Sequence, residues 1–82
     1  ASASDAAAEA AMRHFGHVHP RVRWAALEVW ARLLSMHIMA PIKFFEQASE
    51  ALFAAAGADT YNRVRQRGLL VLMLLTGLDA AA

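Results

Sequence analysis

The sequence predicts a small all-α protein that forms a single domain over residues 1–82. Apolar side chains recur at helical spacing along most of the chain, and proline or glycine residues separate the periodic stretches. We expect helices at about residues 5–15, 20–39, 41–56 and 60–78, between tails at 1–4 and 79–82. They would pack as a four-helix antiparallel bundle or as two helical hairpins, completed by a dimer partner.

The first predicted helix is rich in alanine, the residue with the highest helix propensity. Either Ser2 or Ser4 can cap its free amide groups, and Asp5 places a negative charge near the positive end of the helix. Gly16 is expected to end it. Because its apolar row is thin, we expect this helix to be lightly docked on the rest of the protein.

The second predicted helix, residues 20–39, is the central one. Pro20 suits its first position, since the amide proton that proline lacks would be unpaired there. Its apolar arc is about twice the ~100° that a helix at the edge of a globule needs, so it requires cover on two sides. His37 falls within this arc and is expected in the core. Pro41 either separates this helix from the third, at 41–56, or kinks one long helix, and the pattern favours the break.

The fourth predicted helix, residues 60–78, changes character halfway. Asp59 or Thr60 can cap it, and its first half is rich in arginine. Residues 69–75 are apolar on all sides, so this half has to be enclosed by other helices. Gly68 lies at the changeover, where the missing side chain allows close approach by another backbone.

The amount of apolar side chain predicts association with another chain. The sequence is 59% hydrophobic, above the ~45–50% usual for soluble domains. A domain of this size buries only about 60% of the surface that its unfolded chain exposes. Leaving ~400 Å² of surplus apolar surface in water would forgo ~10 kcal/mol. We therefore expect a homodimer, or a subunit that packs on the helices of a protein partner.

Charge and cysteine content exclude several classes. The net charge is +1, which disfavours a protein that wraps nucleic acid. There is no cysteine, and thus neither a disulfide nor a thiolate metal site. The longest apolar run is far shorter than the ~18–20 residues of a membrane span, and no intact signal peptide is visible. These features favour a cytoplasmic location.

Two stretches of the chain resemble each other. Residues 21–35 (RVRWAALEVWARLLS) and 63–77 (RVRQRGLLVLMLLTG) share Arg-Val-Arg, a valine and two leucines, at an offset within the ~40–47 residues of two-helix solenoid repeats. Residues 19–27 (HPRVRWAAL) resemble the second helix of a HEAT-type repeat. This resemblance implies two HEAT-like helical hairpins and a protein-binding scaffold rather than an enzyme.

A cluster of histidines offers a second function. His14, His17 and His19 flank Gly16, and the loop could fold the third imidazole back toward the first two. Three imidazole ligands with one open position suit zinc or nickel. The alternative is a solvated helix end whose histidines pair with free carbonyl groups. No acidic residue lies beside them to act as a base, so a hydrolytic site is not expected.

No catalytic arrangement is recognisable, and we expect a non-enzymatic protein-interaction module, such as an adaptor, a chaperone-like protein or a regulatory subunit. A small metal-binding protein is one alternative, and an amphipathic protein that binds membrane surfaces is another. The arginines at the two Arg-Val-Arg helix starts could converge on an acidic protein surface. The predicted partner-binding residues are the two tryptophans, two leucines of the apolar run and these arginines: Trp24, Trp30, Leu70, Leu74, Arg21, Arg23, Arg63, Arg65 and Arg67.

Overall fold

The computed structural model describes the backbone of residues 2–81 and the side chains of residues 2–77. Over this range the protein is helical without strands, which confirms the predicted all-α class. In chain order, the helices are α1 (Ala3–Met12), α2 (Pro20–Ser35), α3 (Ala40–Lys43), α4 (Phe45–Ala58) and α5 (Asn62–Ala81).

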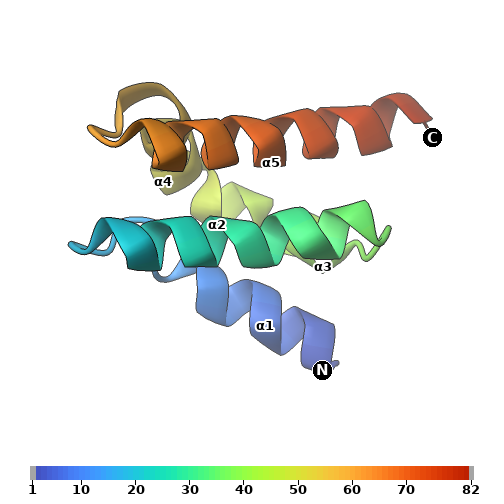
Figure 1. Cartoon of the computed structure of the whole chain (residues 1–82). Helices are drawn as coiled ribbons and strands as arrows, with labels where there is room; N and C mark the ends of the chain where they lie inside the picture. The colour runs from blue at the N-terminus through green and yellow to red at the C-terminus, as the bar shows by residue number, and fades with distance from the viewer. Residues whose placement is uncertain (1, 82) are drawn as a thin grey trace.

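Helix α2 is central, as predicted, and packs most extensively against α5. These two helices lie side by side and run in the same direction, with α1 on the other side of α2 (Figure 1). Helix α4 packs against α5, and the short α3 contacts both α1 and α2. The two stretches with similar sequences are therefore parallel neighbours. None of the described helices combines the length and the apolar character needed to cross a bilayer.

Helix α1 begins at Ala3, two residues before the predicted start, because Ser2 is the residue that caps it. The Ser2 hydroxyl accepts a hydrogen bond of 3.0 Å from the amide of Asp5. The helix ends at Met12 rather than at residue 15, and a turn leads through Gly16 to α2. The carboxylate of Asp5 also pairs with Lys43 at 2.9 Å, which connects α1 to α3.

Trp30 anchors α1 on α2 from the centre of the core. Its side chain is fully buried, and its indole N–H donates a hydrogen bond of 2.9 Å to the carbonyl oxygen of Ala8. The Phe15 ring meets the indole edge-on, with 5.0 Å between the ring centroids. Helix α1 is therefore held more firmly than its thin apolar row indicated.

Helix α2 ends at Ser35, four residues earlier than predicted, in a Schellman motif around His37. His37 has a φ of 59°, the left-handed conformation that glycine usually adopts at this position. The amide of Ile38 donates to the carbonyl of Leu33 at 2.9 Å, and that of His37 donates to Leu34 at 3.0 Å. The expected core position of His37 is wrong, since its side chain is exposed. The break before Pro41 is present.

The predicted third helix is divided into α3 and α4 at Phe44, which has φ −107° and ψ 5°. Pro41 lies in the first turn of α3, where its missing amide proton costs no hydrogen bond. Helix α4 then continues to Ala58, two residues beyond the predicted end. The break gives the short α3 its own direction, so Lys43 can reach Asp5 on α1.

Helix α5 starts at Asn62, two residues after the predicted start, and continues to Ala81, beyond the predicted end at 78. Of residues 69–75, only Val71 is fully buried, whereas Leu69 and Met73 are 49% and 68% exposed. One chain therefore does not enclose this apolar segment. The strip of α5 that faces the core contains Val64, Gly68 and Val71, which are all buried.

Gly68 allows the backbones of α4 and α5 to approach closely, as predicted. A Cβ atom at Gly68 would lie 3.0 Å from both the Cα and the amide nitrogen of Ala56. Gly68→Ala is expected to destabilise the fold by about 1–3 kcal/mol, because backbone atoms have to move apart. The matched control is Gly77→Ala in the same helix, where a Cβ atom meets nothing within 4 Å. It should stabilise the helix by up to ~1 kcal/mol. Urea unfolding measures both, and equal effects would contradict this packing.

His37→Gly is expected to raise the free energy of unfolding by about 0.5–1 kcal/mol, because glycine adopts a positive φ without steric cost. His37→Val should lower it, since a β-branched residue is strained in this conformation. Thermal or urea unfolding of the two variants gives the comparison. A destabilised glycine variant would show that the imidazole itself stabilises the turn.

Candidate functional site

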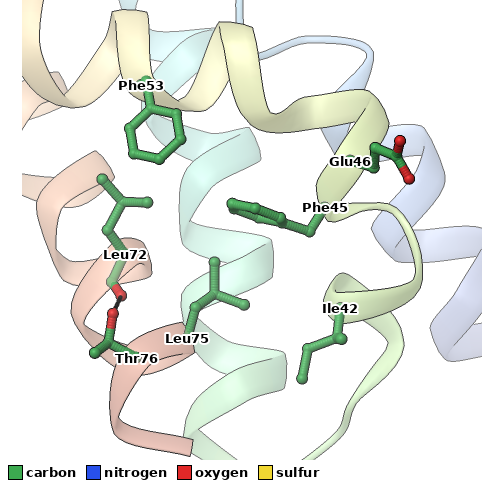
Figure 2. A pocket seen from close by; sticks show the side chains of 7 residues that line it. All are labelled: Ile42, Phe45, Glu46, Phe53, Leu72, Leu75 and Thr76. Atoms are coloured by element: carbon green, nitrogen blue, oxygen red, sulfur yellow. Dashed lines mark hydrogen bonds between the residues drawn. The ribbon is translucent and has the colours of Figure 1, made fainter. Parts of the chain in front are cut away.

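An apolar groove lies between α5 and the segment formed by α3 and α4. It has a volume of about 480 Å³ and is lined by Ile42, Phe45, Glu46, Phe53, Leu72, Leu75 and Thr76. Figure 2 shows the phenylalanine and leucine side chains pointing toward one another across it, with the Glu46 carboxylate directed away. The Thr76 hydroxyl donates to the carbonyl of Leu72 at 2.9 Å, so it is already paired. The groove thus offers a partner almost only apolar contacts.

Two exposed side chains of α5 extend this groove into a wider surface. Leu69 lies one turn before both Leu72 and Met73, so it connects the groove lining to Met73 along the helix. On the opposite wall, Phe53 is 55% exposed and Ile42 is 44% exposed. The groove and these α5 residues together form what we call the α4–α5 face: Ile42, Phe45, Phe53, Leu69, Leu72, Met73 and Leu75.

The sequence analysis did not identify the α4–α5 face as a binding surface. Phe45 and Phe53 carry a helical spacing that is typical of core residues, and they pack on each other with ring centroids 6.2 Å apart at an angle of 80°. Nothing in that spacing distinguishes a covered aromatic from one at the rim of a groove. The only available signal was the apolar run at 69–75, which lacks a polar side.

The predicted arginine residues lie together at the starts of α2 and α5. Three of them, Arg23, Arg65 and Arg67, form hydrogen bonds or ion pairs within the protein. The guanidinium of Arg23 donates to both carboxylate oxygens of Asp59, at 2.7 and 3.0 Å. It also donates to the carbonyl of His17 at 2.8 Å. Arg65 donates to the carbonyl of Asp59 at 2.6 Å. This network joins the loop before α2 to the loop before α5.

Asp59 is the anionic centre of this network. Its side chain is only 6% exposed and that of Arg23 is 13% exposed. Burial opposes the ionisation of Asp59, but hydrogen bonds from Arg23 and the Tyr61 amide outweigh it and hold the pKa of the carboxyl below its usual 3.8. The charges of Arg23 and Arg65 act in the same direction. Asp59 therefore stays ionised at neutral pH.

Arg67 is engaged between the two helices. It pairs with Glu28 at 3.2 Å, and its guanidinium lies 5.0 Å from the ring centroid of Trp24. Arg21 and Arg63 differ from the other arginines at the helix starts, because both are exposed and neither pairs with a carboxylate among residues 2–77. Both line one depression of about 500 Å³ at the helix starts, together with Pro20, Trp24, Tyr61 and Val64.

The other predicted partner-binding residues lie at different depths. Trp30 is fully buried and leaves no surface for a partner in this conformation. Trp24, Leu70 and Leu74 are half-buried and pack against the core. Trp24 and Leu70 also line a depression on the α2 side of α5.

The three histidines near Gly16 do not converge on a metal site. His14 and His17 stack with ring centroids 5.8 Å apart. Nδ1 of His17 accepts a hydrogen bond from the His19 amide, and Nδ1 of His19 accepts one from Arg21 and so caps α2. Among residues 2–77, no group of three histidine or acidic side chains could hold a metal ion. All three histidines therefore interact with the backbone near helix ends, but only His14, whose Nδ1 lies 3.0 Å from the Ala10 carbonyl oxygen, pairs with a carbonyl as the alternative described.

The chain matches no known family model, and neither a curated protein nor a solved structure shows significant similarity to it. Function is therefore argued from the two surfaces described above.

Asp59→Asn tests the ion-pair network, because asparagine keeps the oxygen that accepts from the Tyr61 amide but loses the charge that pairs with Arg23. We expect a loss of about 1.5–3 kcal/mol at neutral pH, the range for hydrogen bonds to charged groups. The folded-state pKa of Asp59 is lowered, so its stabilisation is complete above the unfolded value and disappears as the pH falls through the folded value. The difference between wild type and variant should therefore shrink below about pH 4.

Urea unfolding at several pH values measures this difference. Asp5→Asn is the matched control, since it removes the carboxylate of an ion pair whose lysine is largely exposed. It is expected to cost much less than Asp59→Asn. Equal losses in the two variants at neutral pH would contradict the structural role of the Arg23–Asp59 pair.

Proposed function

We propose that this chain is a non-enzymatic protein-interaction module that pairs with a second copy of itself through the α4–α5 face. The observation that supports this function is the cluster of large apolar side chains left exposed there, of which Phe53, Leu69 and Met73 are each about half exposed or more. Contiguous exposed apolar patches commonly mark protein–protein contacts, whereas isolated apolar residues are ordinary.

The composition of this face favours a second copy as the occupant. In a two-fold dimer the same patch faces itself, so any net charge on it would meet an equal charge. Among the side chains that the structure describes, the one charged residue in the lining of this groove is Glu46, and its carboxylate points away from the apolar residues (Figure 2). Two such faces can therefore meet without electrostatic repulsion.

The accessible surface area of the chain is compatible with such a dimer. A typical stable interface covers about 800 Å² on each partner, and the chain exposes 5152 Å² in total. For a protein of 8.9 kDa, scaling predicts roughly 4,800 Å² for a folded monomer. The total area therefore requires no partner by itself, and the position of the exposed apolar atoms is what favours one.

The parallel contact of α2 and α5 is compatible with the HEAT-type resemblance. In a solenoid, equivalent helices of successive repeats stack as neighbours. The stretches that resemble each other in sequence occupy these two helices. A scaffold of two such hairpins would use its open helix faces for protein binding, in keeping with the proposed function.

Met73→Glu is expected to turn a dimer into a monomer, because it would place a carboxylate in the buried part of the interface on each copy. Sedimentation equilibrium over a range of concentrations measures the mass. Met36→Glu is the matched control, since Met36 is 66% exposed, close to the 68% of Met73, but lies at the end of α2. It should leave the association unchanged, as judged by the same mass curve.

A wild-type chain that stays monomeric at high micromolar concentration would refute self-association through this face. Circular dichroism of both variants checks that the helices are retained. An equal loss of association in the two variants would place the interface elsewhere.

A further inference from the structure

We infer that the depression at the shared start of α2 and α5 is a second binding site, which takes an acidic peptide segment of a partner protein. We call it the α2–α5 groove and define it by Pro20, Arg21, Trp24, Tyr61, Arg63 and Val64. This second site rests on the proposed interaction function and adds a partner to it. It uses different residues from the α4–α5 face, so an experiment can refute one site without refuting the other.

The parallel arrangement of α2 and α5 creates this groove. Both helices start at the same end of the molecule (Figure 1), so both positive helix ends lie near the same depression. Neither helix has an acidic residue in its first turn, where one would offset the helix dipole. An adjoining depression shares Trp24 and Arg63 and continues along α5 to Arg67 and Leu70.

The charge of the groove is available to a ligand. Arg23 and Arg67 are paired with Asp59 and Glu28, so they add little net attraction. Arg21 and Arg63 are exposed on the groove lining, and the part of the chain that the structure describes offers neither of them a carboxylate partner. A guanidinium group binds a carboxylate through two parallel N–H donors, so each can hold one acidic side chain.

The rest of the lining favours a peptide over a small anion. Pro20 and Trp24 are apolar and partly exposed, and the ring of Tyr61, which is 54% exposed, adds an aromatic surface, whereas Val64 is buried. An inorganic anion would use only the arginines, whereas a peptide of glutamates and leucines would use both kinds of surface. Tryptophan, tyrosine and arginine are also the residues most enriched at energetically important interface positions.

Two other occupants fit less well. A second copy of the chain, placed groove to groove, would bring the same two arginines against each other. Nucleic acid calls for a broad basic surface, and the chain has a net charge of only +1. An acidic segment of a different protein matches both the charge and the apolar lining.

Fluorescence anisotropy with a fluorescein-labelled peptide of glutamate and leucine tests this inference on the full chain. We expect saturable binding that weakens with added salt, and about tenfold or greater loss of affinity in the double variant Arg21→Ala/Arg63→Ala. Arg13→Ala/Arg32→Ala is the matched control. This control removes the same number of positive charges as the double variant. Its two arginines are exposed and pair with Glu9 and Glu28, each four residues earlier in the chain. It should bind as the wild type does.

Three outcomes overturn the inference. The first is equal binding of a glutamine–leucine peptide, which would show that charge is not recognised. The second is displacement by inorganic phosphate but not by chloride at equal ionic strength, which would show a phosphate site. The third is loss of peptide binding in Met73→Glu, which would place the peptide on the α4–α5 face. Retained peptide binding in a Met73→Glu variant that is monomeric supports both sites.

Tryptophan emission gives a second measurement. Trp30 is fully buried with its indole N–H paired, so a change on adding the unlabelled peptide is expected to come from Trp24 in the groove. The change should disappear in Trp24→Phe. A change that persists in Trp24→Phe would contradict binding in this groove.

Discussion

Helix α5 presents one narrow strip of fully buried residues to the core, with partly buried leucines packed beside it, and the two surfaces of functional interest depend on this contact. Val64 and Val71 fill the interior, and Gly68 brings the α5 backbone against α4 at Ala56. Because the fully buried strip is narrow, the leucines beside it are only partly buried, and Leu69 and Met73 are exposed. One side of the helix borders the apolar groove toward α4, and the other borders the basic groove toward α2.

The two surfaces differ in charge. At the starts of α2 and α5, Asp59 and Glu28 neutralise some of the arginines and hold the helices in place, while Arg21 and Arg63 pair with no carboxylate of residues 2–77. On the opposite side of α5, the groove lining that the structure describes is apolar except for Glu46 and Thr76. An uncharged face can pair with its own copy, whereas a basic one repels itself and attracts an acidic partner. One small helical body could thus dimerise and bind a second protein at once.

Local sequence signals predicted several features of the fold correctly. Pro20 starts α2, Ser2 caps α1 and Gly68 permits a close backbone contact, because each of these residues has a conformational property that acts within its own turn. The end of α2 was missed, since His37 occupies a left-handed position where glycine or asparagine is the usual signal. Phe44 interrupts the third predicted helix, and its sequence context contains no signal for that break.

The binding surfaces were harder to predict, because they depend on pairs of residues far apart in the chain. Arg23 was identified as a possible partner-binding residue, but its carboxylate partner Asp59 is 36 positions away and was expected only as a helix cap. Helical spacing also places Phe53 among apolar residues without showing which side of the helix stays open. Excess apolar composition predicted association with another chain, which stays a prediction, and only the packing of α5 shows which apolar side chains are exposed.

Methionine methyl NMR on a dilution series is the most direct measurement of the central claim, that the α4–α5 face is covered by a second copy. The chain has four methionines, of which Met73 lies on this face and Met36 does not. The account predicts that the Met73 methyl resonance moves as the protein associates, while that of Met36 stays constant. Movement of Met36 alone, or of neither resonance while the mass doubles, would contradict it.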